Sequence, residues 1–167
     1  MRRRGFTLIE ISVVVAVIAV VVAIALPNFL RIRMVSNETS VIEAMRAVHL
    51  SCESQRSQGT TFGGVGEYPL GLQTLTTANP PALDARFNAV VNGAWRGYQW
   101  SYTPGPQRQQ AVGNMAFTFR DTYTLQADPV SRGSDGQRSF YMDQTGVIRF
   151  NARGRAGPND TPLERTS

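Results

Sequence analysis

The sequence predicts an α+β fold in which one long N-terminal α-helix packs on a small antiparallel β-sheet of about four strands. Three observations support this prediction. An apolar run fills most of the first thirty residues, a pattern of helical period follows in residues 31–58, and segments of alternating polarity lie in residues 97–150. A chain of 167 residues has room for one domain and a long terminal element, but not for two ordinary domains.

Charge and cysteine content exclude several classes of protein. The net charge is +5, and all 17 basic residues other than histidine are arginine. Without the three arginines that precede Gly5, fourteen arginines face 12 acids, so the chain lacks the basic stripe expected of a nucleic-acid-binding domain. Cys52 is the single cysteine, which excludes an internal disulfide, and no cluster of cysteine and histidine predicts a zinc site. We therefore expect no metal and no cofactor.

The first thirty residues combine a basic leader, residues 1–5, with an apolar segment, residues 6–30. That segment has 25 residues, which is enough for a helix to cross a hydrocarbon layer of ~30 Å at a rise of ~1.5 Å per residue. One residue is unusual in this setting. Glu10 places a carboxylate at the edge of the apolar segment, where it costs up to a few kcal/mol in lipid and usually marks a function.

Two other kinds of protein share these features. A secretory signal peptide also has a basic start and an apolar stretch, and Ala23-Ile24-Ala25 fits its cleavage rule. An ordinary membrane anchor fits as well. The arginines do not decide the orientation of the segment in the membrane, because three lie near it on each side. These are Arg2, Arg3 and Arg4 before it, and Arg31, Arg33 and Arg46 after it.

The stretch Arg4-Gly5-Phe6-Thr7-Leu8-Ile9-Glu10, followed by an apolar helix, resembles the processing signature of type IV prepilins and of the related pseudopilins of type II secretion. Pro27 also falls where that family usually carries a helix-bending proline. The resemblance implies a pilin-like fold, cleavage between Gly5 and Phe6 by a prepilin peptidase on the cytoplasmic side, and N-methylation of Phe6. It covers only the first thirty or so residues.

Glu10 gains a physical role if this cleavage occurs. The new amine of Phe6 is a cation four residues before Glu10, so the carboxylate can pair with its own amine, with that of a neighbouring subunit, or extend to the lipid headgroups. In the family, the pair between subunits is the one proposed, and it sets the register of subunits that enter a filament. Pro27 removes one backbone hydrogen bond, which predicts a bend or a locally loosened helix.

Residues 31–58 continue the helix with an amphipathic pattern. Apolar residues recur close to helical spacing at Met34, Val35, Val41, Ile42, Met45, Val48 and Cys52. Charged residues occupy other positions, namely Glu38, Glu43, Arg46, Glu53 and Arg56, and Gly59 is a suitable stop. His49 and Cys52 lie on or beside the apolar stripe, and we interpret both as packing residues because no third catalytic partner is evident.

The rest of the chain divides into three parts. Residues 59–96 predict a connecting loop with short helices, residues 97–150 an antiparallel meander, and residues 151–167 a flexible tail. A hairpin connection is expected at Asp143-Gln144-Thr145-Gly146. Asp128, Asp135 and Asp143 lie in the meander, and we interpret them as turn residues rather than calcium ligands, although some pseudopilins carry calcium near their C-terminal loops.

The sequence and its resemblance together predict a structural protein that is not an enzyme: a subunit of a type IV pilus-like surface filament, assembled through its N-terminal helix. The resemblance implies these partners: other copies of the chain in a helical filament, the prepilin peptidase/methylase, and the pilus assembly machinery. It implies insertion in the inner membrane before assembly and location in a surface pilus or periplasmic pseudopilus afterwards. No nucleic acid is expected for a major subunit. A type II secretion pseudopilin, or a minor pilin whose head binds DNA or a surface, remains an alternative.

Overall fold

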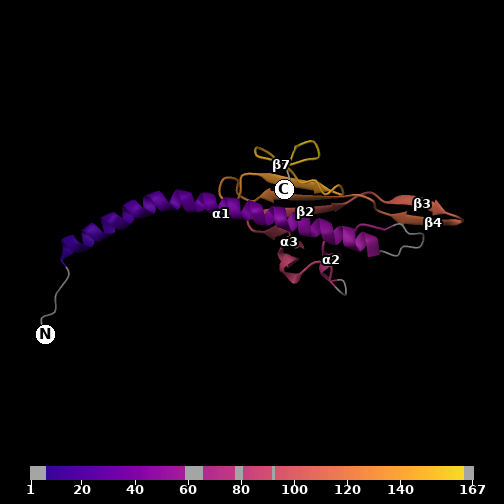
Figure 1. Cartoon of the computed structure of the whole chain (residues 1–167), viewed down its shortest axis with the longest axis horizontal. Coiled ribbons are helices and arrows are strands. Elements are labelled where there is room, and N and C mark those ends of the chain that lie inside the picture. Colours follow the sequence, from indigo (N-terminus) through magenta and orange to yellow (C-terminus); the bar gives the residue numbers. More distant parts are fainter. Residues whose placement is uncertain (1–6, 59–65, 78–80, 92, 164–167) are drawn as a thin grey trace, which may run out of the picture.

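The computed structural model describes residues 7–58, 66–77, 81–91 and 93–163. One bowed helix projects from a head that holds the strands (Figure 1). This helix, α1 (Leu8–Gln58), has 51 residues and passes through Pro27 without interruption. The α+β class predicted from the sequence, with a long N-terminal helix packed on an antiparallel sheet, is confirmed. Gly5 and Phe6, the predicted processing residues, and Gly59, the predicted end of the helix, lie outside the described residues.

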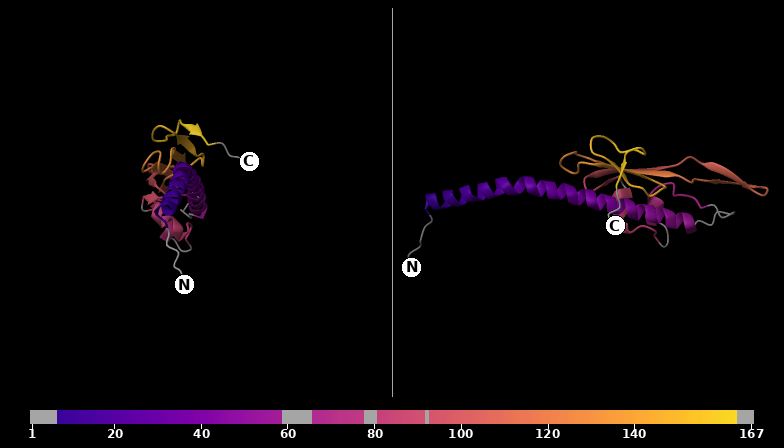
Figure 2. Two further views of the ribbon diagram at one scale, coloured as in Figure 1. Left: turned by 90° about the vertical axis from the view of Figure 1, so that its left-hand side faces the viewer. Right: turned by 45° about the horizontal axis from the view of Figure 1, so that its top comes forward.

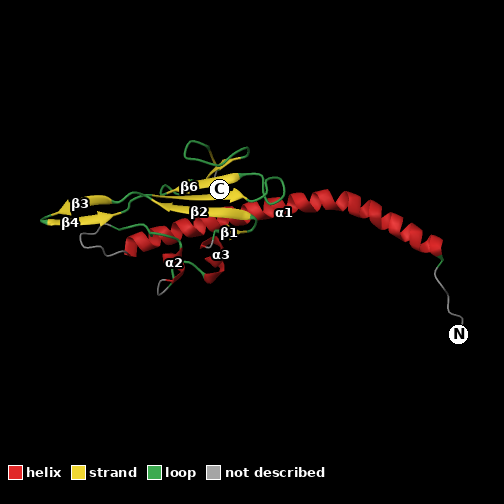
Figure 3. Cartoon of the chain, turned by 180° about the vertical axis from the view of Figure 1, so that it is seen from behind, coloured by secondary structure: helices red, strands yellow, loops and turns green. Residues whose placement is uncertain are grey.

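The head is built on an antiparallel sheet of six strands in the order β1-β2-β5-β6-β7-β8, and α1 runs along this sheet (Figure 3). The strands are β1 (Ala94–Trp95), β2 (Tyr98–Pro104), β5 (Tyr123–Pro129), β6 (Ser139–Asp143), β7 (Arg149–Asn151) and β8 (Thr161–Pro162). β6 and β7 are joined by the turn predicted at Asp143–Gly146, where the Gly146 N–H donates to the Asp143 carbonyl at 3.0 Å.

Alternate residues of the central strands face α1. On β5, Tyr123, Leu125 and Ala127 are buried while the residues between them are partly exposed. The same period of two places Tyr98 and Trp100 of β2 in one core with the buried stripe of α1. The helix therefore closes the apolar face of the sheet, as the alternation in the sequence predicts.

Short helices cover the other side of α1. They are α2 (Gln73–Thr77), the single 3₁₀ turn η1 (Ala85–Phe87) and α3 (Asn88–Val91). Figures 1 and 2 place them across α1 from the sheet. Leu75, Leu83 and Val90 are buried there and join the same core. The long helix thus has the sheet on one flank and the connecting segment on the other.

β3 (Arg108–Val112) and β4 (Met115–Phe119) form a separate two-stranded ribbon between β2 and β5 in the sequence. The ribbon extends past the C-terminal end of α1 (Figure 1). Its turn contains Gly113, whose φ of +63° favours glycine. The strands of the ribbon carry exposed residues on both faces, including Gln109, Gln110 and Thr118.

The expected number of about four strands was too low, since the described residues hold eight strands. β3 was missed because its residues are mostly polar and follow Pro104-Gly105-Pro106, which indicates a stop. β1 and β8 contain only two residues each, too few for a pattern of alternation.

The C-terminal segment 151–167 was expected to be flexible, but its described residues are held to the sheet. β8 pairs with β7, and the Ala156 carbonyl accepts a hydrogen bond from Gln126 at 3.1 Å. Arg155 pairs with Asp128 at 3.0 Å. This covering explains why Phe140, Tyr141 and Met142 are all buried even though neighbouring residues of a strand point to opposite faces of a sheet.

Candidate assembly site

The first half of α1 is exposed along its whole described length. Every residue from Thr7 to Arg33 is exposed, and the large side chains among them are almost all aliphatic. Within α1, an 18-residue window reaches a mean hydropathy of 3.0 with none of it buried, so length and composition suit a membrane span. A helix that is apolar all round needs lipid or other helices as its surroundings. This segment is therefore the candidate assembly site.

Thr7 and Glu10 form a capping box at the start of α1. The Glu10 N–H donates to Thr7 Oγ1 at 3.3 Å, and the Thr7 N–H points back to Glu10 Oε2 at 3.5 Å. This reciprocal pattern satisfies backbone donors that the first turn leaves free. The spacing Thr-x-x-Glu in the sequence is the signal for this cap, and the earlier interpretation of Glu10 by its charge alone did not use it. The carboxylate remains exposed and accessible to a cation.

Two other polar or restrictive residues are accommodated in the apolar half. The Ser12 hydroxyl donates to the Leu8 carbonyl one turn earlier at 2.9 Å, so it needs no external acceptor. Pro27 lies inside the continuous helix and lacks an N–H, which leaves one carbonyl of the preceding turn without its usual donor. The bow of α1 in Figure 2 is consistent with the bend expected of a helix that contains proline.

The head begins to hold α1 at Asn37 and Glu38. Asn37 Nδ2 donates to the Asp135 carbonyl at 2.9 Å. Glu38 Oε1 accepts from the backbone N–H groups of Gln137 and Arg138 at 2.8 and 3.0 Å, while Glu38 Oε2 accepts from Arg138 Nε and Nη2, each at 2.8 Å. Four donors on one buried carboxylate fix the helix to the loop between β5 and β6.

Glu38 shows where the sequence pattern was insufficient. It had been placed among the charged residues that fill positions outside the apolar stripe, yet only 7% of it is exposed. Val35, which the pattern placed on the apolar stripe, is 58% exposed instead. The head ends near these residues. It therefore covers the apolar stripe from Asn37 toward the C-terminal end of α1, but it does not cover Val35.

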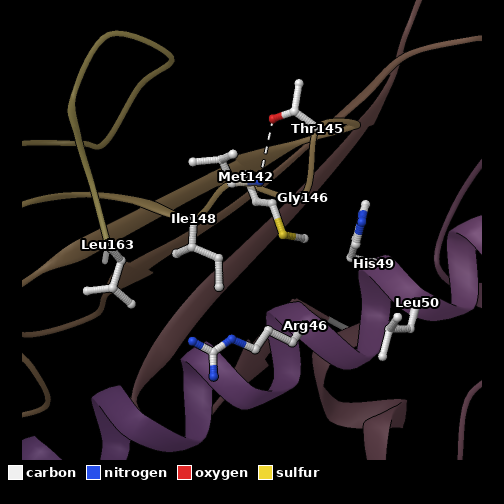
Figure 4. Close-up of a pocket in the computed structure, with 9 residues that line it drawn as sticks. Arg46, His49, Leu50, Met142, Thr145, Gly146, Ile148 and Leu163 are labelled. Carbon is white, nitrogen blue, oxygen red and sulfur yellow. Dashed lines mark hydrogen bonds between the residues drawn. The ribbon is translucent and has the colours of Figure 1, made fainter. Parts of the chain in front are cut away.

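A hollow of about 460 Å³ lies beside α1, between the helix and the turn that joins β6 to β7 (Figure 4). His49 points into it from the helix, and its Nδ1 is 2.7 Å from the hydroxyl of Tyr123. The His49 ring is so close to Gly146 that a Cβ there would lie 2.5 Å from Nε2. Gly146 also has a φ of +71°, so both the turn and the contact require glycine.

The titratable groups nearest His49 in the core serve packing. Burial raises the pKa of Tyr123, so this partner of His49 stays neutral at physiological pH. Burial, and secondarily the charge of Glu53, raises the pKa of the Cys52 thiol to about 12, so it remains protonated and unreactive. Within the described ranges, no group of three or more His, Cys, Asp or Glu residues is placed to hold a metal ion.

The N-terminal region matches known proteins. The family model described as the prokaryotic N-terminal methylation motif matches residues 1–26. The type IV major pilin protein PilA of Myxococcus xanthus is 40% identical over 53 residues, and the type IV narrow pilus major component PilA5 of Thermus thermophilus is 42% identical over 48 residues. No solved structure matches the chain.

These matches cover a minor part of the chain. They cover 32% and 29% of this chain, and they span only 24% and 41% of the two relatives' own lengths.

Proposed function

We propose that the protein belongs to the type IV pilin family and is a structural subunit of a type IV pilus-like filament, because its first 26 residues match the N-terminal methylation motif and it shares segments with two type IV pilins. The chain is cut between Gly5 and Phe6, Phe6 is N-methylated, and the apolar half of α1 anchors the subunit in the inner membrane until assembly. In the filament, that half packs against the same half of other copies. Both curated relatives carry names of major pilin components, which supports this proposal.

The observation that carries the proposal is the fully exposed apolar half of α1 with Glu10 at its start. Its aliphatic side chains find no partner in the described part of the chain, and about 25 cal/mol is gained for each Å² of such surface removed from water. In a bundle of identical helices, a carboxylate at the edge needs a cation. The amine of a processed Phe6 on a neighbouring subunit supplies this cation. Only axial offsets between neighbouring helices that bring this amine to the Glu10 carboxylate are therefore favourable.

The ribbon of β3 and β4 provides a second surface for neighbouring subunits. It lies at the opposite end of the molecule from the apolar half of α1 (Figure 1). An isolated two-stranded hairpin is marginally stable in water. Packing of this ribbon against another head would stabilise it, and lateral contacts between subunits are expected there.

The decisive experiment separates the two roles of Glu10. A Glu10→Gln substitution keeps an acceptor for the capping box but removes the charge, whereas Thr7→Val removes the cap but keeps the charge. We expect Glu10→Gln to lower the amount of sedimentable filament at least about tenfold, because an unpaired amine in a desolvated interface costs about 3 kcal/mol or more. Thr7→Val should assemble nearly as well as the unmodified chain.

Mass spectrometry of the mature N-terminus completes the test. A methylated Phe6 in the unmodified chain and in both variants is the expected result. If the Glu10→Gln variant assembles normally, the pairing of charges is wrong. A mature chain that begins at Leu26 would identify an exported protein instead, and an intact Met1 would identify an ordinary anchor.

A further inference from the structure

A second hollow, of about 400 Å³, lies where α1 leaves the head. α1 contributes one side, and the turn between β1 and β2 contributes the other. The residues that line it include Phe29, Ile32, Arg33, Asn37, Arg96 and Gly97. It differs from the hollow beside His49 in its charge, because two arginines face it from separate elements.

Neither arginine has an acidic partner in the part of the chain that the structure describes. The ion pairs there join other residues, and Glu38, one turn beyond Arg33, is already saturated by Arg138. The Arg96 guanidinium lies 5.5 Å from the ring centroid of Trp95, a contact that leaves its N–H donors free. The Asp135 side chain approaches Gly97 but is not among the residues that line the hollow. The site is therefore cationic and suited to an anion.

The backbone at Arg96 is strained in a way that a simple turn does not require. Arg96 has a φ of +54°, and among the described residues it is the one non-glycine residue with a positive φ. With Gly97 at +73°, it forms a two-residue turn between the paired Trp95 and Tyr98. Asparagine, aspartate or glycine is favoured at the first position of such a turn. Strain at a charged residue that lines a hollow indicates a role for its side chain.

The position of the hollow along α1 matches the headgroup layer of a bilayer. This step rests on the proposed insertion of the apolar half of α1 in a membrane. If the hydrocarbon layer ends near Leu30, Arg33 stands about 4.5 Å beyond it, because each helical residue rises ~1.5 Å. The headgroup region adds roughly 5–7 Å on each side of a bilayer. Phe29 then lies at the edge of the acyl chains, Ile32 lies about 3 Å beyond that edge, and Arg33 and the Arg96 that lines the same hollow lie at the level of the phosphates.

We propose that this hollow binds the phosphodiester of an anionic phospholipid headgroup, with Arg33 and Arg96 as its two cationic donors. Guanidinium groups match phosphate oxygens in charge and in the geometry of paired N–H donors. The bound lipid holds the head of the membrane-inserted subunit at a fixed distance from the bilayer. The lipid has to leave when the subunit enters a filament.

The test compares three arginine variants of the full chain in detergent. Native mass spectrometry measures the binding of phosphatidylglycerol and of phosphatidylcholine. Arg33→Gln and Arg96→Asn remove one donor each, and asparagine suits the turn at residue 96. Arg31→Gln is the matched control, because Arg31 is also exposed on α1, two residues away, but does not line the hollow. Thermal melting of the head confirms that each variant is folded.

We expect Arg33→Gln and Arg96→Asn each to weaken phosphatidylglycerol binding about fivefold, since one arginine near an anionic surface contributes about 1 kcal/mol. Arg31→Gln should change it less than about twofold, and phosphatidylcholine should bind more weakly than phosphatidylglycerol. Equal weakening by Arg31→Gln, or equal binding of the two lipids, would overturn the site. Displacement of the lipid by inorganic phosphate at millimolar concentration would reassign it to a free anion.

Vesicle flotation distinguishes failure of this site from failure of the proposed function. If the full chain does not float with phosphatidylglycerol vesicles, the proposed membrane insertion is wrong, and the lipid site is wrong with it. If the chain floats but the arginine variants bind lipid as the unmodified chain does, the lipid site alone is wrong.

Discussion

The two halves of α1 are one continuous helix in opposite surroundings. From Thr7 to Arg33 every residue is exposed, whereas from Asn37 to Cys52 one stripe is buried against the head. The change occurs within a single turn, where Asn37 and Glu38 bond to the loop between β5 and β6. The first half therefore depends on an environment outside the chain for its stability, while the second half is stabilised by the chain's own core.

The largest expected difference between the halves is in the free energy of unfolding of the head. Met45 is fully buried and Val17 is 58% exposed. We expect Met45→Ala to lower this free energy by about 2–5 kcal/mol, because it leaves a cavity in the core. Val17→Ala should change it by less than about 0.5 kcal/mol. Denaturant unfolding of the full chain in detergent, followed by near-ultraviolet circular dichroism of the head aromatics, measures both.

The outcome decides whether the halves are energetically separate. If Val17→Ala destabilises the head as much as Met45→Ala does, the exposed half contributes to the core and the comparison fails. If both variants unfold as the unmodified chain does, the docked half is not held by its apolar stripe.

A smaller effect is expected where the halves meet. Glu38→Ala removes the acceptor of three hydrogen bonds and leaves the Arg138 guanidinium without its ion-pair partner. We expect the free energy of unfolding to fall by about 2–3 kcal/mol, less than for a fully buried pair, because the Arg138 side chain is 32% exposed. Glu43→Ala is the control, since Glu43 is an exposed residue of the same helix. Equal effects of the two substitutions would show that the bonds to Glu38 do not hold the helix.

Glu38 also shows how far the sequence predicts this fold and its site. The long helix, its two surroundings and the meander follow from hydrophobic period, which is a local property of the chain. The burial of Glu38 depends on donors about a hundred residues away, so no local pattern indicates it. Similarly, β8 forms by pairing with the free edge of β7, and Arg155 pairs with Asp128 on a different strand. Neither contact is indicated by the local sequence.

The pattern of the candidate assembly site is also local, and assembly through it stays a prediction. Thr7, Glu10 and Pro27 all lie within the first thirty residues. The capping box was visible in the spacing of Thr7 and Glu10. The hollow lined by Arg33 and Arg96 was not, because it joins two elements far apart in the chain and includes an arginine in a turn conformation that its residue type disfavours.

The smallest expected effect concerns alkaline pH, which acts on the docked half through Cys52. Burial raises the pKa of this thiol from its ordinary value of 9.0 to about 12. The folded state therefore holds a proton that the unfolded state releases, so the stabilisation is complete below pH 9 and is lost as the pH rises from 9 to about 12. At pH 10, we expect the contribution of Cys52 to the free energy of unfolding to be about 1 kcal/mol lower than at pH 8.

A Cys52→Ala variant isolates this contribution, because the comparison uses the change with pH rather than the absolute stability. Burial also raises the pKa of all five tyrosines above its ordinary value of 10.0, so they too lower the stability as the pH approaches 10. The contribution of Cys52 is therefore the difference in decline between the two chains, and we expect the variant to lose about 1 kcal/mol less than the unmodified chain from pH 8 to pH 10. If the free energy of unfolding of Cys52→Ala declines with pH as steeply as that of the unmodified chain, Cys52 is not held as a neutral thiol in the core.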